Sequence, residues 1–97
     1  MILHHIQSSS AQSAGLRLAL RYAGKQDALI ISGNATGSLL HASWQAKLAG
    51  KTVYFLDEDV HARGLTAMIT ARYPDAKLVD YHDWVKLSLT FDKVITW

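Results

Sequence analysis

The sequence contains no cysteine and a single proline among its 97 residues. The absence of cysteine excludes disulfide bonds, thiolate metal ligands, and a cysteine nucleophile or persulfide carrier. The sequence also lacks any run of roughly 18 consecutive apolar residues, which a membrane-spanning helix would need. Its N-terminus lacks the basic start and apolar stretch of a signal peptide. We therefore expect a cytoplasmic protein that does not associate with membranes.

Charge of either sign is also sparse. Ten Lys and Arg residues and eight Asp and Glu residues give a net charge of +2, and the basic residues are scattered from Arg17 to Lys93 without a run. Basic residues scattered in this way do not indicate the basic patch that direct binding of nucleic acid requires. The five histidines are spread along the chain, so no metal site is expected, and no motif predicts a cofactor. No Ser, His and acid set is recognisable by spacing, although such sets assemble in space.

The composition is that of a folded domain. Hydrophobic residues make up 49% of the chain and charged residues 19%, which is far from the composition of disordered segments. A chain of 97 residues is too short for two cores, so we expect one domain over residues 1–97.

Short apolar runs alternate with helix-like segments. The runs predict strands at residues 2–6, 28–32, 52–56 and 76–81. The run at 28–32 is continuously apolar up to its last residue, as in a strand that helices bury on both faces. This alternation predicts an α/β protein, a single three-layer α/β/α domain with a mainly parallel sheet of four or five strands. The tail at 91–97 is ambiguous.

The segments predicted to be helical begin near residue 10 or 12 and end at 24, and then cover 36–49, 60–72 and 83–89. Gly24 and Gly50 follow the first two and predict left-handed C-terminal caps. Gly64 predicts a break in the third, and Asp80 or Asp83 lies near the start of the last.

Three segments follow strands, at the edge of an α/β sheet where ligands usually bind. The serine-rich loop from Ser8 to Ser13 could hold an anion such as phosphate, although a simple capping role for Ser10 or Ser13 explains it as well. Residues 33–37 fit a turn better than a phosphate-binding loop. The acids at 57–59 suit the positive end of a helix dipole or the docking of a partner.

Four motifs occur in a fixed order along the chain. They are Leu3-His4, the segment Leu-Asp-Glu-Asp-Val-His-Ala-Arg-Gly-Leu at 56–65, the segment Val-Asp-Tyr-His-Asp-Trp-Val-Lys-Leu at 79–87, and the closing Trp97. Together they resemble the TusB/DsrH family over essentially the whole chain. The sequence departs from the family pattern at Ser32-Gly33, where members more often have Asp-Gly.

The resemblance implies a subunit of a TusBCD-like complex, a heterohexamer of three related α/β proteins that relays sulfur as a persulfide. The product of this relay is the 2-thiouridine at the wobble position of certain tRNAs. Each carrier in the relay needs a cysteine thiolate, and this chain has none. The resemblance therefore implies a non-catalytic, architectural role beside TusC-like and TusD-like subunits, with a TusE-like carrier as an indirect partner. The sequence leaves open whether the chain associates with itself when these partners are absent.

Two sets of residues follow as hypotheses from the resemblance. Trp84, Phe91 and Trp97 contribute to subunit contacts or anchor the tail, because a tryptophan at the end of the sequence has to be held by packing. Asp57, Glu58 and Arg63 form a loop that faces a neighbouring subunit or the TusE-like carrier.

Two alternative functions stay open. The first is a stand-alone α/β module that binds an anion or small molecule through the Ser8 to Ser13 loop. The second is a hydrolase or transferase whose triad assembles only in the fold. The sequence favours tRNA thiolation over sulfur oxidation because it has no cysteine.

Overall fold

The computed structural model describes residues 1–9 and 14–97. At its centre is a parallel sheet with the strand order β4-β3-β2-β1-β5. The strands are β1 (Ile2–Ile6), β2 (Ala28–Ile31), β3 (Thr52–Leu56), β4 (Lys77–Val79) and β5 (Lys93–Thr96). The predicted α/β fold with a parallel sheet is confirmed, and the ambiguous tail forms the fifth strand.

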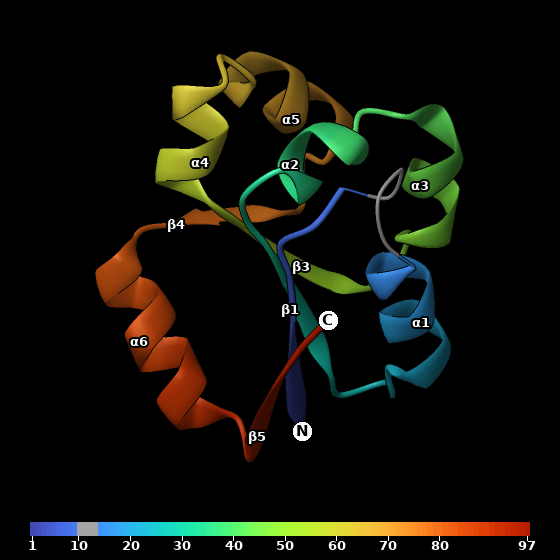
Figure 1. The fold of residues 1–97 in the computed structure, drawn as a ribbon, viewed down its shortest axis with the longest axis vertical. Coiled ribbons are helices and arrows are strands. Elements are labelled where there is room, and N and C mark those ends of the chain that lie inside the picture. Colours follow the sequence, from blue (N-terminus) through green and yellow to red (C-terminus); the bar gives the residue numbers. More distant parts are fainter. Residues whose placement is uncertain (10–13) are drawn as a thin grey trace.

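Helices cover the two faces of the sheet unequally. One face carries α1 (Gly15–Tyr22), α2 (Ala35–Ser38), α3 (Ala42–Lys47), α4 (Asp57–Ala62) and α5 (Thr66–Arg72), and the other carries α6 (Tyr81–Thr90) (Figure 1). Among the described residues, no helix has both the length and the apolar character needed to cross a bilayer.

The hydrophobic core lies on both sides of the sheet, as the continuous run in β2 predicts. All four residues of β2 are buried. Leu29 and Phe55 belong to the larger cluster, beneath α1 to α5. Leu3 and Ile30 belong to the smaller cluster, which α6 covers. Alternate residues of each strand thus point to opposite clusters.

The single helix predicted over 36–49 is wrong. The chain forms α2 and α3 instead, and His41 between them has an extended backbone with φ −69° and ψ 129°. In a continuous helix the carbonyl of Leu39 would accept an N–H four residues later. Here the hydroxyl of Tyr73, just after α5, donates to that carbonyl at 2.6 Å. A tertiary contact therefore replaces the local helical hydrogen bond.

The predicted helix ends are confirmed at three places and wrong at one. Gly50 and Gly64 have positive φ angles of 78° and 68°, and the side chain of Asp80 caps α6 by accepting the N–H of Asp83 at 2.7 Å. The left-handed cap predicted at Gly24 is wrong, because α1 ends in extended backbone at the residue before it. The N–H of Gly24 instead donates to Asp27. The start predicted for this first helix, at residue 10 or 12, lies outside the described residues.

Candidate functional site

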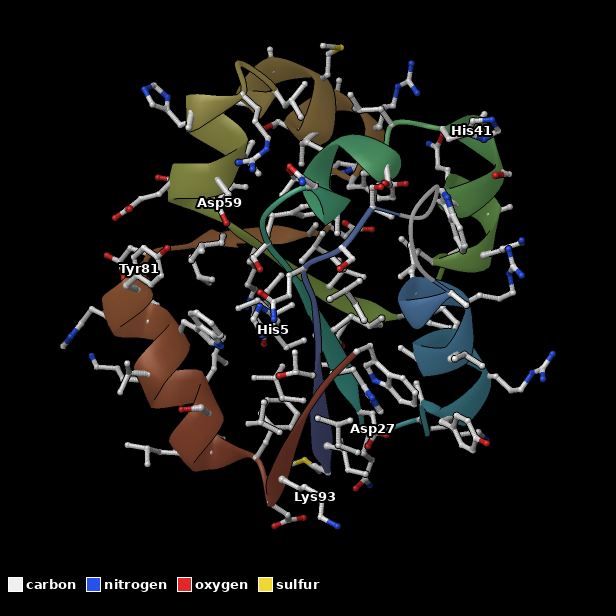
Figure 2. All side chains as sticks on the ribbon, in the orientation of Figure 1. His5, Asp27, His41, Asp59, Tyr81 and Lys93 are labelled. Atoms are coloured by element: carbon white, nitrogen blue, oxygen red, sulfur yellow. The ribbon has the colours of Figure 1, made fainter. Side chains whose placement is uncertain are left out.

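Parallel α/β sheets usually bind ligands at the carboxyl edge of the sheet. The edge joins the end of β1, the turn after β2 and the start of α4. Figure 2 shows Asp59 projecting from α4 toward the turn after β2. His5 lies near the end of β1 on the face that α6 covers.

Asp59 and Arg63 tie α4 to the turn after β2. The Oδ2 atom of Asp59 accepts the backbone N–H of Gly33 at 2.7 Å. Arg63 donates to the carbonyl of Asp59 at 3.1 Å and to the Oδ1 atom of Asn34 at 3.2 Å. Gly33 has φ 55°, and a Cβ there would lie 3.0 Å from the carbonyl of Gln7. This turn therefore requires glycine, and the side chain of Arg63 is engaged within its own chain.

Asp57 and Glu58 are exposed at this edge. They lie in the first turn of α4 rather than in the loop that we predicted, as the dipole preference of acids explains. Their carboxylates make no hydrogen bond or ion pair with a described residue. Of the three residues predicted to face a partner, these two present free charge, whereas Arg63 braces the fold.

His5 is buried beside Ser32 and Trp84. Its Nε2 atom lies 2.7 Å from the hydroxyl oxygen of Ser32, and its ring packs edge-on against Trp84 with 4.7 Å between centroids. Burial lowers the pKa of His5 below the usual 6.5, and the negative charge of Asp59 opposes that change. At neutral pH His5 is therefore an uncharged member of the core.

The contact between Ser32 and His5 is a pair that spacing did not reveal, because His5 lies on β1 and Ser32 directly follows β2. Ser32 is 6% exposed and His5 7% exposed. No hydrogen bond between described residues links Asp59 to His5. The described residues therefore assemble no Ser-His-Asp relay here, and the contact satisfies two buried polar groups.

His4, on the opposite face of β1, anchors the last residue of the sequence. The indole N–H of Trp97 donates to Nδ1 of His4 at 3.0 Å, and Nε2 of His4 lies 3.0 Å from Oδ2 of Asp27. Because an indole nitrogen only donates, Nδ1 of His4 is the acceptor and Nε2 carries the proton. The ring of Trp97 also stacks on Tyr22, with 5.8 Å between centroids. The tail of the chain is thus packed within its own domain.

Asp27 receives several hydrogen bonds at this anchor. Partial burial alone would raise the pKa of its carboxyl group, but donors from Gly24, His4 and Ile2 outweigh that effect and hold the pKa at about 2. The carboxylate therefore stays charged at any pH above about 4. It accepts the N–H of Nε2 of His4.

Trp84 and Phe91 pack onto the smaller core cluster from the two ends of α6, and both stay partly exposed. Trp44, in contrast, is a buried core residue. Of the three residues proposed as partner contacts or anchors, Trp97 makes its contacts with His4 and Tyr22 of its own chain. Trp84 and Phe91 hold α6 against the sheet.

Pockets lie at the opposite, amino edge of the sheet. One of about 520 Å³ lies beside the starts of β3 and β4, with Lys51, Arg72 and Lys77 in its lining. Another, of about 350 Å³, is lined by Lys25 and Asp27 among others. Among the described residues, no group of three or more His, Asp or Glu side chains could hold a metal ion.

The serine-rich loop is only partly described. Ser8 is exposed after β1, whereas residues 10–13 lie outside the described part of the chain. Anion binding by this loop therefore stays a prediction.

Comparison with known proteins gives a family and a fold. The family model described as DsrH like protein matches residues 8–94. The crystal structure of the ychN protein from E. coli has a TM-score of 0.79 to this chain at 17% sequence identity, covering 99% of this chain and 97% of that one. No curated protein matches the sequence. This structural likeness shows that the two proteins share a fold.

Proposed function

Because the chain belongs to the DsrH-like protein family, which makes it a sulfur-relay-related protein, we propose that it is a non-catalytic subunit of a TusBCD-like complex. In this proposal the complex is a heterohexamer in the cytoplasm, and it passes persulfide sulfur toward 2-thiolation of the wobble uridine in tRNA. TusC-like and TusD-like subunits are the direct partners, and the TusD-like subunit presents the sulfur-carrying cysteine.

The observation that carries the proposal is the combination of this family with a chain that has no cysteine. A persulfide can be held only by a sulfur nucleophile, so this chain cannot carry the relayed sulfur itself. The polar groups at its carboxyl edge also bind one another: Asp59 takes the N–H of Gly33, and His5 contacts Ser32. Such an edge supports a role in holding partners rather than in chemistry.

Within this proposal, Asp57 and Glu58 form the contact surface at the carboxyl edge. Both carboxylates are exposed on the first turn of α4, which Arg63 and Asp59 hold rigidly against the turn after β2. A basic surface of a partner subunit or of a TusE-like carrier would complement them.

The proposal is tested by tagging the chain at its N-terminus in its host, purifying it gently and identifying the co-purified chains by mass spectrometry. We expect two cysteine-containing relatives and a native mass that fits two copies of each of three subunits. Recovery of the chain without such relatives would overturn the proposal.

A charge-reversal variant then tests the surface. Asp57→Lys combined with Glu58→Lys should weaken assembly or carrier binding at least tenfold, because rim charges govern recognition. Asp75→Lys is the matched control, since it reverses an exposed charge at the amino edge. If both variants bound equally well, the carboxyl edge would not be part of the interface.

A further inference from the structure

The two pockets at the amino edge of the sheet join into one groove. The larger pocket, of about 520 Å³, and the smaller one, of about 350 Å³, share Ala49, Gly50 and Lys51 in their linings. The larger pocket forms because the edge strand β4 starts late. Its first residue, Lys77, pairs with Tyr54, so the first two residues of β3 have no partner in β4. The joined pockets are called here the amino-edge groove.

Positive charge dominates the lining of this groove. Among the described residues, four basic and two acidic side chains line it. They are Lys25, Lys51, Arg72 and Lys77, and Asp27 and Asp75. The surplus of two positive charges equals the net charge of the whole chain, +2. The rest of the molecule is therefore balanced in charge, and the positive field is concentrated at this edge.

The cations of the groove are not neutralised within the chain. Lys25, Lys51 and Lys77 are exposed, and none of them forms an ion pair with a described residue. Arg72 has no carboxylate partner among these residues either. Asp27 already accepts hydrogen bonds from donors of its own chain. The groove thus presents cations without counter-charges, as surfaces that bind phosphate groups do.

The topology of the sheet gathers lysines that are far apart in the sequence. Lys25 precedes β2, Lys51 directly precedes β3, and Lys77 begins β4. These three strands are neighbours in the sheet, and adjacent strands lie about 4.8 Å apart. The three lysines therefore follow one another across the amino edge. The sequence shows them as scattered charges, because the row exists only through the strand order.

An exposed aromatic ring lies at one end of the groove. Tyr22 is the last residue of α1 and directly precedes residues 23–25, which line the smaller pocket. Figure 2 shows Asp27, from the same lining, at this end of α1. Tyr22 is 68% exposed, although one face of its ring stacks on Trp97. The other face is open to a planar ligand such as a nucleic-acid base.

We propose that the amino-edge groove binds a single strand of nucleic acid, with its three lysines at the phosphates and a base stacked on Tyr22. A row of cations suits a chain of phosphates better than one small anion, and an open aromatic ring suits a base better than an acidic peptide. This proposal goes beyond the proposed function, in which the chain supports sulfur transfer and contacts no nucleic acid itself.

Fluorescence anisotropy tests the binding, with the purified chain and a labelled oligouridylate of about eight nucleotides. We expect a Kd below about 100 μM at about 50 mM salt. The logarithm of the association constant should fall with the logarithm of the salt concentration with a slope of about −2, as three phosphate contacts to a single strand predict. No saturable binding at about 1 mM protein would overturn the proposal, and so would equal affinity for uridine monophosphate.

Charge variants locate the contacts. Lys51→Gln and Lys77→Gln should each raise the Kd about threefold to tenfold and make the salt slope shallower by about 0.7. Asp75→Asn removes an acid from the groove and should lower the Kd about twofold. Lys86→Gln is the matched control, because Lys86 is exposed on α6, which covers the opposite face of the sheet. Equal Kd values for the lysine variants of the groove and the control would overturn the proposal.

A further variant tests the stacked base. Tyr22→Ala should raise the Kd for the oligouridylate at least about fivefold, whereas Tyr81→Ala, at a tyrosine 47% exposed on α6, should leave it unchanged. Circular dichroism checks that each variant is folded. A glutamate peptide of the same charge that bound the wild type as tightly as the oligouridylate would overturn the assignment to nucleic acid. Because these assays use the purified chain alone, they are independent of whether other subunits co-purify from the host.

Discussion

The hydrogen bond between Trp97 and His4 gives the sharpest test of how the last strand is held. Trp97→Phe keeps an aromatic ring against Tyr22 and His4 but removes the indole N–H that donates to Nδ1 at 3.0 Å. His4 is 1% exposed, so this nitrogen has little access to water. The variant therefore leaves a buried acceptor without its donor.

The size of the effect follows from that burial. An unsatisfied buried polar group costs about 1–3 kcal/mol, so we expect Trp97→Phe to lower the free energy of unfolding by about 2 kcal/mol. For a domain of this size that corresponds to a fall in Tm of about 10 °C. Trp97→Ala also loses the ring packing. Its cost should reach about 3–4 kcal/mol, because the side chain is only partly buried.

The assay is urea unfolding followed by circular dichroism at one fixed protein concentration, since self-association would add stability. Tyr22→Phe is the control, because it keeps the stacking ring and should change stability by less than about 0.5 kcal/mol. The reasoning would be refuted if Trp97→Phe cost less than about 0.5 kcal/mol, or if the Phe and Ala variants were equally stable.

Two further predictions concern pH and backbone conformation. Burial lowers the pKa of His5, so the unfolded chain binds a proton more readily and the contribution of this group is lost as pH falls below about 6.5. Urea unfolding at pH 7.5 and 5.5 should show that the fall in unfolding free energy between the two pH values is smaller in His5→Gln than in the wild type. The variant of an exposed histidine, His82→Gln, should not reduce this fall. An equal fall in the two variants would contradict the role given to His5. Gly50→Ala forces φ 78° on a side chain and should cost about 1 kcal/mol. Gly37 has no positive φ, and a Cβ there would lie 3.9 Å from the side chain of Leu65, so Gly37→Ala should stabilise by about 0.5 kcal/mol. Equal unfolding free energies for the two alanine variants would exclude backbone strain at Gly50.

Much of the fold could be predicted because local signals agree with it. The continuous apolar run of β2 predicted a strand buried on both faces. The glycine at position 64 predicted where α4 breaks from α5, whereas α4 begins at Asp57, before the start predicted at residue 60. Residues 36–49 were mispredicted because the break there depends on Tyr73, whose hydroxyl reaches Leu39 from a distant segment. Local periodicity carries no information about such a contact.

The candidate site was less predictable. The position of the acids 57–59 at the carboxyl edge followed from topology. The sequence could not show that Asp59 binds Gly33 while Asp57 stays free. Which acid reaches Gly33 depends on how α4 is positioned against the turn after β2. The pairing of His5 with Ser32 depends on the register of β1 and β2, which no spacing rule supplies.

The anchoring of β5 has a consequence for exchange of strands between molecules. Trp97 contacts His4, which lies 93 positions earlier in the chain, and β5 has no fully buried residue. Contacts of such high contact order close slowly, and a strand with so little burial opens easily. When β5 opens, the buried strand β1 becomes a sheet edge that β5 of another molecule could fill. The indole–imidazole hydrogen bond therefore slows the opening of β5, and variants that lack it should exchange strands between molecules faster.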